Sequence, residues 1–595
     1  MSQLHIERVD NLPVILHWLL KMQVQVIIDG IWYPHSNWAG LSYGQVAVLF
    51  VSYIIHQRSH RLSSMEQWVK EHHTVLEQVT GWSIGDKEAT DDRLGIMLDA
   101  LGSDKEQSVE FQRQLGGQVI QAYELPTKVG RYDTSSFSVH HAPADGEQPA
   151  HDLLRFGHSK DKRPDLVQFK QGLGTLDPAG VPLVTHTLSG ETADDGLYLS
   201  AWDEMCQTIG HTDWLYVADC KAAACLTRAT VDHNGGHYLF PLPMTGQRPA
   251  WLRQQLRDPS NEPETIYLPE LTDKACPETL PEFDEGCNRR DKRPQAVGQG
   301  FVVKRTLEAD LAAGTPHTWD EQWFVSQSFA HAERTKRSLQ RRVSRTVDML
   351  HSMRPKSKET ARDWQQRADH LLKQRKMGDY VTATVHETVT TTKRYLKPGR
   401  PTPNSPYRLI EQCHLSLDVQ IDETALDEAC RLAGWRIYVN NDEPDDISLP
   451  QATAYYRDEW LVERGWHRFK KGDLPALPLF LRIPERIIGL MLLLFVALQA
   501  LTLIEFVARR NLEAQKTEIA GLVPGNPKNK TARPTAERLL AAFTTLHFVV
   551  ETDHTQVRGY LNETLTPLQQ QILLLLELPE TIFDLSFTEP LLQFL

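Results

Sequence analysis

The sequence has few cysteines, and they follow no disulfide or metal-binding pattern. The chain has 595 residues and only seven cysteines, an odd number without one Cys-x-x-Cys pair. A disulfide framework uses an even set, and a zinc ribbon needs closely spaced pairs. We therefore expect neither, and the composition fits a reducing cytosol. The seven are Cys206, Cys220, Cys225, Cys276, Cys287, Cys413 and Cys430.

An excess of positive charge is also missing. Lys and Arg total 64 against 77 Asp and Glu, which gives a net charge of −13. This balance argues against a protein that coats nucleic acid indiscriminately, although it allows a local basic surface. The distribution of charge along the chain therefore says more about function than its sum.

Only one apolar run is long enough to cross a membrane, at residues 487–504. Gln499 and Thr502 lie inside the run, and Arg486 and Glu505 bound it closely, so we expect a buried central helix. The N-terminus lacks the basic leader and cleavage site of a secretion signal. We expect a cytoplasmic protein without a membrane, and a membrane-anchored protein is the alternative.

The N-terminal part of the chain is expected to be a helical module, residues 1–115. Its stretch LSYGQVAVLFVSYII opens with a capping box, Ser42 and Gln45. From about residue 130 the pattern changes to strands, at residues 131–140, 165–177 and 181–190, the last two joined by a turn. A helix at residues 196–210 follows, and then a short apolar strand that ends at Asp219.

After a long interruption, residues 435–441 predict one more strand, and a helix around Glu463 follows it. The combined order, βββαβα…βα, matches an RNase H-like sheet. We therefore expect an α/β multidomain chain whose RNase H-like mixed sheet is split by a large α+β insertion. The expected parts are the helical N-terminal domain (1–115), the first part of the core (116–229), a β-rich insertion with a long basic helix (230–430), the second part of the core (431–515) and a C-terminal helical region (516–595).

The stretch YYRDEWLVERGWHRFKKG, residues 455–472, mixes aromatic, acidic and basic side chains. Tyr456, Glu463 and Lys470 recur at every seventh position, and on one continuous helix seven residues turn only about 20° short of two full turns. We therefore expect these three side chains to form a stripe with the acid at its centre. The alternative is an amphipathic surface helix with incidental ion pairs.

Three carboxylates are expected to converge on the sheet: Asp133 on its first strand, Asp219 at the end of its fourth, and Glu463 on the later helix. Converging carboxylates repel one another unless cations lie between them, and Mg²⁺ prefers carboxylate, water and phosphate oxygens. Two such ions can activate an attacking oxygen and stabilise a leaving one. Taken singly, Asp133 also fits an Asx turn and Asp219 a helix N-cap.

The order Asp, Asp, then Y-x2-R-x3-E-x6-K resembles the DDE transposases of bacterial insertion sequences, in the IS-four superfamily. The stretches GHSKDKRPDLVQF, GVPLVTHTLSGETAD and FLRIPERIIGLMLLLFVALQAL agree with it, so the resemblance covers nearly the whole chain. It implies a cut-and-paste transposase that binds terminal inverted repeats and cuts and joins DNA strands. One position departs from the signature, because Glu459 stands where the family has Arg.

The resemblance also assigns roles to residues. It implies Asp133, Asp219 and Glu463 as ligands of two Mg²⁺ ions, for which Mn²⁺ can substitute. Tyr456 and Lys470 would contact transposon-end DNA, and Arg457 or Arg464 could replace the missing signature Arg. The N-terminal module would bind DNA ends, a hairpin would form on the cut end, and a homodimer would act in a synaptic complex in the nucleoid.

A local basic surface is expected at residues 331–376, where 14 Lys or Arg face 5 Asp or Glu, an excess of +9. Leu339, Val343, Val347 and Leu350 keep helical spacing, so one face can pack on the protein. We expect Arg341, Arg342 and Arg345 on the other face to contact DNA phosphates. A solvated charged helix is the alternative.

Two further functions fit the same residues. One is a structure-specific nuclease on the same core. The other is a cleavage-deficient DNA-binding protein derived from a transposase, and the presence of all three carboxylates argues against it.

Overall fold

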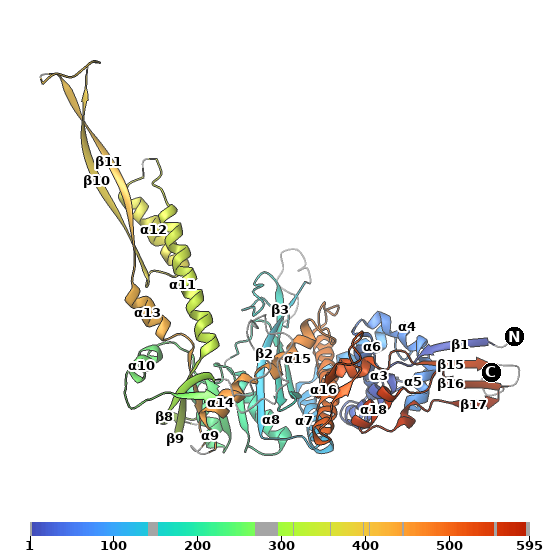
Figure 1. Ribbon diagram of the computed structural model, residues 1–595. Helices are drawn as coiled ribbons and strands as arrows, with labels where there is room; N and C mark the ends of the chain where they lie inside the picture. The colour runs from blue at the N-terminus through green and yellow to red at the C-terminus, as the bar shows by residue number, and fades with distance from the viewer. Residues whose placement is uncertain are drawn as a thin grey trace.

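A computed structural model of the chain has an extended body that carries a long arm at one end (Figure 1). The structure describes residues 3–140, 153–194, 196–267, 296–312, 314–357, 359–396, 398–403, 405–442, 446–552 and 556–590. Cys276, Cys287 and Lys358 lie outside these residues, and the five described cysteines are free thiols.

The body is built on a nine-stranded mixed sheet of order β4-β3-β2-β5-β6-β12-β9-β8-β7. The expectation of an α/β chain with a mixed sheet is therefore confirmed. The strands are β2 (Val129–Val139), β3 (Val167–Leu176), β4 (Val181–Ser189), β5 (Leu215–Ala218), β6 (His237–Pro241), β7 (Glu264–Tyr267), β8 (Ala296–Asp310), β9 (Pro316–Ser328) and β12 (Trp435–Asn440).

The first half of the sheet follows the expected order and adds one strand. β2, β3 and β4 are antiparallel neighbours, and β5 pairs parallel to β2. The next neighbour is β6, which is parallel to β5, whereas β12 lies beyond β6 and is antiparallel to it. The strand expected at residues 435–441 is present as β12, but it is not the fifth strand, because β6 comes before it. β6 is the short run HYLFP, and periodicity alone does not distinguish such a run from part of a helix.

Helices cover both faces of this sheet. α8 (Leu197–Ile209) and α9 (Cys225–His233) link β4, β5 and β6, while α14 (Leu449–Arg457) packs with Val129, Val217, Leu239 and Phe324 on one face. α15 (Trp460–Lys470) follows α14 and contacts β2. The short α10 (Arg248–Gln255) packs on the sheet through Trp251, whose ring lies 4.9 Å from that of Trp323 on β9.

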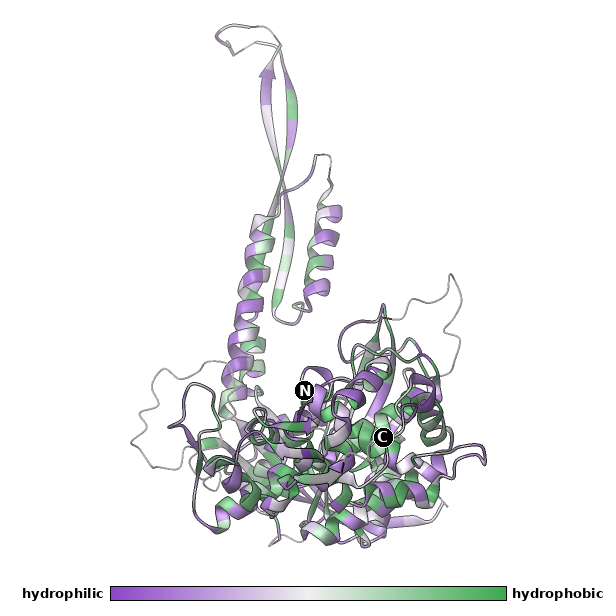
Figure 2. Cartoon of the chain, turned by 90° about the vertical axis from the view of Figure 1, so that its right-hand side faces the viewer, coloured by the Kyte–Doolittle hydropathy of each residue, from purple (hydrophilic) through white to green (hydrophobic). Residues whose placement is uncertain are grey.

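The residues expected to form an inserted domain, 230–430, are divided between sheet and arm. β6 to β9 extend the core sheet, because the inner half of β9 is buried and pairs with β12. Only the later part projects, as the arm of Figures 1 and 2. The arm consists of α11 (Phe329–Ser352), α12 (Ala361–Arg375), β10 (Val381–Tyr395), β11 (Tyr407–Ile421) and α13 (Glu423–Arg431).

The N-terminal helices and the C-terminal region together surround one central helix, α16 (Pro484–Ala514). The capping box of Ser42 and Gln45 is present at the start of the third helix. The helices are α1 (Leu12–Lys21), α2 (Val24–Ile31), α3 (Tyr43–Gln57), α4 (Leu62–Glu71), α5 (His73–Thr80), α6 (Asp91–Ser103) and α7 (Lys105–Tyr123).

The C-terminal region is not simply helical as expected. It contains β13 (Ile519–Ala520), β14 (Lys530–Thr531), α17 (Ala536–Ala541), β15 (His547–Thr552), β16 (Gln556–Leu561), α18 (Pro567–Leu575), η1 (Glu580–Phe583) and β17 (Phe587–Pro590). β1 (Gln3–Arg8) pairs with β15, so the two ends of the chain share a four-stranded sheet, β1-β15-β16-β17. The N-terminal segment is therefore not a detached module.

α16 is the apolar segment, and it is the core helix that the sequence predicts. It is the one described helix long and apolar enough to cross a membrane, yet nearly all of its apolar stretch is buried in the protein. α6 crosses it closely, since a Cβ on Gly102 would lie 1.9 Å from the carbonyl oxygen of Glu485, and one on Gly489 would lie 2.3 Å from that of Leu98. Larger residues at either crossing would push the helices apart.

Candidate functional site

Asp133 and Asp219 are brought together by the pairing of β2 with β5. In this parallel pair Tyr132 lies opposite Ala218, so the next residue on each strand is one of the two aspartates. Neighbouring strands are about 4.8 Å apart, and residues at matching positions point to the same face. The predicted meeting of Asp133 and Asp219 is therefore present in the structure.

A small cavity lies over these aspartates. Its wall also contains Glu459 and Tyr456, which come from the segment that joins α14 to α15, and it does not include Glu463. The lining residues are Arg131, Tyr132, Asp133, Val217, Ala218, Asp219, Tyr456, Glu459 and Val462.

Asp133 is held by two neighbours. The indole Nε1–H of Trp466, on α15, donates a hydrogen bond of 2.9 Å to Asp133 Oδ2. The Lys160 ammonium lies 3.7 Å from Oδ1 and also donates to Thr134 Oγ1. Burial nevertheless raises the pKa of Asp133, and the charge of Asp219 adds to this rise, while Lys160 opposes it. Ionisation of Asp133 while Asp219 is also charged is therefore unfavourable in the metal-free site.

The predicted stripe on one continuous helix is wrong, because α14 ends at Arg457 and α15 begins at Trp460. Arg131, buried on β2, explains the break. Its Nη1–H donates to the carbonyl oxygen of Tyr455 at 2.7 Å, which a continuous helix would offer to the N–H of Glu459. That N–H bonds to the carbonyl oxygen of Tyr456 instead, at 3.3 Å.

The break turns Glu459 toward the cavity. Burial raises its pKa, and the negative charges of Asp133, Glu463 and Asp219 contribute in the same direction. Tyr456, on the other side of the break, packs its ring 4.7 Å from that of Tyr438. The position at which the family signature has Arg is thus occupied by a third carboxylate in the cavity wall.

Glu463 and Lys470 lie on α15, away from the cavity wall. Glu463 is exposed in the first turn of the helix. Lys470 Nζ forms an ion pair of 2.9 Å with Asp161 and lies 5.2 Å from the centre of the Phe137 ring. Its ammonium is therefore partly neutralised by Asp161.

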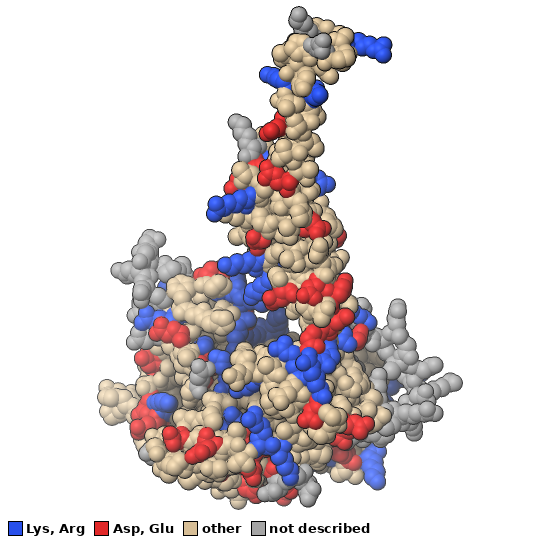
Figure 3. All heavy atoms as spheres, turned by 90° about the vertical axis from the view of Figure 1, so that its left-hand side faces the viewer, with Lys and Arg blue, Asp and Glu red and all other residues tan. Residues whose placement is uncertain are grey.

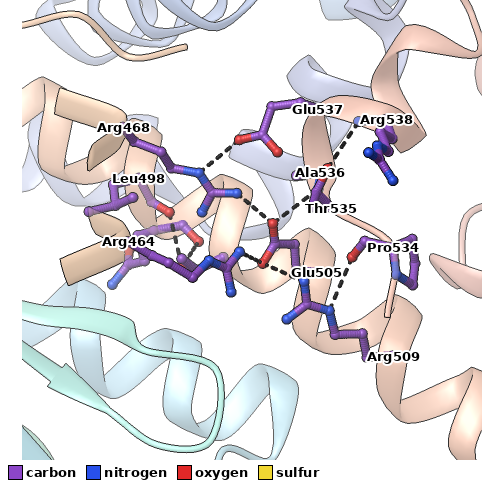
Figure 4. Close-up of polar contacts among 12 residues, drawn as sticks. Arg464, Arg468, Leu498, Glu505, Arg509, Pro534, Thr535, Ala536, Glu537 and Arg538 are labelled. Atoms are coloured by element: carbon purple, nitrogen blue, oxygen red, sulfur yellow. Dashed lines mark hydrogen bonds and ion pairs between the residues drawn. The ribbon is translucent and has the colours of Figure 1, made fainter. Parts of the chain in front are cut away.

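Of the two arginines proposed to replace the signature Arg, only Arg457 is exposed. Arg464 bonds to the fully buried Glu505 of α16, together with Arg468 and Arg509 (Figure 4). Arg468 also bonds to Glu537, at 2.8 Å. Arg464 thus joins α15 to α16 and does not face the cavity.

The arm presents the predicted arginines to solvent. Arg341, Arg342 and Arg345 are exposed on α11, while Val343 and Leu350 on the opposite face are buried. Arg342 also donates to the carbonyl oxygen of Arg375 at 3.1 Å. Figure 3 shows Lys and Arg side chains gathered along the hollow between the arm and the body.

The side chains that line the cavity can be compared with the ligands that the predicted Mg²⁺ ions prefer. Within the described ranges, no three His, Cys, Asp or Glu side chains gather closely enough to hold a metal ion by themselves. Mg²⁺ usually keeps several waters and needs only one or two carboxylates. Asp133 and Asp219 supply that pair, and a bound cation would oppose the rise in the pKa of Asp133 that burial and, to a lesser extent, Asp219 cause. The donor set therefore fits Mg²⁺.

Sequence reasoning identified Glu459 only as a departure from the signature, and it missed Trp466, Lys160 and Arg131. Lys160 and Trp466 stand in stretches that the family resemblance singled out, but their contacts with Asp133 depend on packing. Arg131 had a local signal, since it stands two residues before Asp133 on the same strand and therefore faces the same side of the sheet.

Comparison with known proteins adds no assignment. No protein-family model matches the chain, and no curated protein matches it either.

Proposed function

We propose that this chain is a DNA transposase of a bacterial insertion sequence that cuts and joins DNA strands at terminal inverted repeats. The observation that carries the proposal is the meeting of Asp133 and Asp219 at adjacent strand positions, in a cavity whose wall includes Tyr456, Glu459 and Val462 from the signature segment. The motif thus folds onto the two aspartates from more than two hundred residues away in the chain.

The sheet supports an RNase H-like core. The chain passes through β2, β3, β4, α8, β5, α9 and β6, which is the βββαβαβ order, with β5 and β6 parallel to β2. Ligands of such sheets lie at the carboxyl ends of parallel strands, and Asp219 follows directly after β5. The sheet thus agrees with an RNase H-like core in its strand topology and in the positions of the two aspartates.

In the proposed reaction Asp133 and Asp219 would hold Mg²⁺, or Mn²⁺ in its place, with Glu463 or Glu459 as the third carboxylate. Two bound ions would activate the attacking oxygen and stabilise the leaving oxygen of a phosphodiester. Trp466 orients the Asp133 carboxylate through its hydrogen bond to Oδ2. Arg131 holds the α14–α15 junction through its hydrogen bond to the carbonyl oxygen of Tyr455, and so keeps the Glu459 side chain directed toward the cavity.

The DNA would lie across the hollow between body and arm. Arg341, Arg342 and Arg345 face solvent on α11, and Arg457 is exposed at the end of α14. Tyr456 lies in the cavity wall, and Lys470 lies on α15. The proposed partners are transposon ends and target DNA, bound by a homodimer in the nucleoid, with hairpin ends as an intermediate.

A second candidate is a DNA-binding protein that does not cut. The position of Glu463, exposed and outside the cavity wall, favours it, as does Glu459 in place of the signature Arg. A structure-specific nuclease would use the same cavity without strand transfer.

A cleavage assay separates these functions. Purified protein is incubated with Mg²⁺ or Mn²⁺ and a labelled duplex from the DNA that flanks the gene, with a scrambled duplex as control. Transposition requires cleavage at a terminal inverted repeat and joining of the new 3′ end to a second duplex. Binding without cleavage would favour the DNA-binding protein, and cleavage without joining the nuclease.

Active-site variants test the residues in the same assay. Asp133→Ala, Asp219→Ala and Glu463→Ala should each lower cleavage on the order of 10³-fold or more, while duplex binding persists, because they remove ligands and not phosphate contacts. Glu459→Gln identifies the third carboxylate. If Glu459→Gln abolishes cleavage and Glu463→Ala does not, the assignment of Glu463 is wrong.

A further inference from the structure

The outer part of the arm is a two-stranded ribbon with nothing packed on either face. β10 and β11 pair over their whole length, from Val381 opposite Ile421 to Tyr395 opposite Tyr407. At the base, Val381 and Ala383 are buried against α12, but every β10 residue from His386 to Tyr395 is exposed or nearly so. We call residues 386–416 the distal ribbon. Its ten β10 residues span about 33 Å.

A two-stranded ribbon of this kind is not expected to be stable by itself. An isolated two-stranded hairpin is marginally stable in water, and its free edges invite pairing with other chains. Val389, Leu396 and Leu409 are each more than half exposed, with values of 55%, 61% and 61%. A long exposed ribbon is therefore best explained by a partner that lies along it.

The charge of the distal ribbon indicates which kind of partner. From His386 to Ser416 the sequence has five Lys or Arg against two Glu, Glu387 and Glu411, an excess of +3 in a chain whose net charge is −13. The Nζ of Lys393 lies 4.5 Å from the centre of the Tyr407 ring, which in turn lies 6.0 Å from that of Tyr395. The five are Lys393, Arg394, Lys397, Arg400 and Arg408.

One cross-strand pair is unfavourable in the free protein. Arg394 lies directly opposite Arg408, so two like charges face each other on one side of the ribbon. No ion pair joins either arginine to a carboxylate in the described part of the chain. The same face carries Thr390 opposite Gln412 and Thr392 opposite Ile410, so it is polar and basic. A phosphate group between the two arginines would remove the repulsion.

We propose that the distal ribbon binds duplex DNA as a second contact, away from the central cavity. The proposal rests on the proposed function for the presence of DNA. The major groove, about 12 Å wide, admits a two-stranded β-ribbon, and Arg, Lys, Thr and Gln are the side chains that contact phosphates and base edges. A second copy of the chain fits less well, because neither face of the ribbon offers a continuous apolar surface.

The first test uses the opposed arginines. Arg394→Ala combined with Arg408→Ala should lower the slope of log affinity against log salt by about 1.8, since each phosphate contact contributes about 0.9. The probe is a 40-base-pair duplex of arbitrary sequence, with Lys528→Ala combined with Lys530→Ala, two exposed lysines outside the arm, as the matched control. Thermal unfolding of the ribbon variant should be unchanged or raised, because the variant loses a repulsive pair. If the two arginines served only to stabilise the fold, their replacement would lower the melting temperature.

The second test looks for contact directly. Tyr407→p-benzoylphenylalanine should cross-link to the labelled duplex on irradiation, whereas Tyr33→p-benzoylphenylalanine, at a residue 79% exposed on the N-terminal side, should not. Unchanged salt slopes together with no cross-link, in a protein that binds the duplex, would overturn the inference and leave the proposed function standing. Cross-links to a second copy of the chain would also overturn it. If the wild-type protein fails to bind any duplex, both proposals fail. Binding and cross-linking without strand cleavage would refute the transposase and retain the ribbon.

Discussion

At the scale of single residues, the Asp133 carboxyl sits where the fold opposes its ionisation. Its pKa is raised above the ordinary value of 3.8 by burial and by Asp219. A carboxyl whose pKa is higher in the folded state weakens folding as the pH rises above the unfolded value. The ionised carboxylate therefore costs stability at neutral pH unless a cation is bound.

Asp133→Asn should consequently stabilise the metal-free protein at pH 7, by about 1 kcal/mol, as neutralised active-site charges often do. The gain should disappear below about pH 3.8, where the wild-type carboxyl is protonated in both states. Addition of Mg²⁺ should raise the melting temperature of the wild type and not of the variant. Thermal unfolding with and without Mg²⁺ measures this.

Asp165→Asn is the matched control. Asp165 is exposed and paired with Arg163, which lowers its pKa to about 2, so its replacement should not stabilise the protein. If the stability of the two variants responds equally to pH and Mg²⁺, the ionised Asp133 carboxylate does not destabilise the metal-free protein and does not bind the ion.

Residue-scale prediction from sequence worked where secondary structure alone decides a position. Asp133 and Asp219 were found because strand alternation and a strand end place them at one edge of the sheet. Glu459 and Trp466 were not, because their directions depend on a helix break and on packing between distant segments.

At the scale of elements, the break between α14 and α15 has no local sequence signal. Asp458 and Glu459 are neither Pro nor Gly, so helical periodicity continues through them in the sequence. The break follows from Arg131, which takes the carbonyl group of Tyr455 from another element. Tertiary contacts thus override a local pattern, and the predicted single helix fails for that reason.

α15 carries the next prediction, which concerns Lys470 and its partner Asp161. Lys470→Ala should weaken binding of a duplex that carries the terminal inverted repeat, by removing a phosphate contact. Asp161→Asn should strengthen it, because it frees the Lys470 ammonium from a carboxylate 2.9 Å away. Affinity measured over a salt series, with thermal unfolding as the check on folding, distinguishes the two. If both variants bind DNA like the wild type, Lys470 is part of an ordinary surface ion pair.

At the scale of the whole molecule, α15 is joined to the central helix α16 by a buried charge cluster. Glu505 is fully buried among Arg464, Arg468 and Arg509 (Figure 4). These arginines hold its pKa at about 2 against the opposing effect of burial. The cluster ties α15 to α16, around which both termini fold.

Glu505→Gln should therefore destabilise the protein by about 3 to 5 kcal/mol at pH 7, since it leaves Arg464 and Arg509 without their carboxylate and Arg468 with Glu537 alone. Because the folded-state pKa is lowered from 4.5 to about 2, the stabilising contribution is complete above about pH 4.5 and is lost as the pH falls toward 2. Urea unfolding at several pH values measures the difference. Glu513→Gln, at an exposed position on the same helix, is the control. A loss of stability equal to that of the control would show that the cluster does not hold the body together.

The arm and the body together define the last prediction. Arg341, Arg342 and Arg345 project from α11 on its solvent face, in a stretch with a local excess of +9. If this face lines the DNA path beside the cavity, the combined variant Arg341→Ala, Arg342→Ala and Arg345→Ala should lower the salt slope of duplex binding by up to about 2.7. The decrease should add to that of the ribbon variant, because separate phosphate contacts act independently. Lys87→Ala combined with Lys528→Ala and Lys530→Ala removes three exposed charges outside the arm and should leave the slope unchanged. A slope identical to wild type in the α11 variant would mean that DNA does not pass along this helix and that its charges serve only to keep the exposed arm in water.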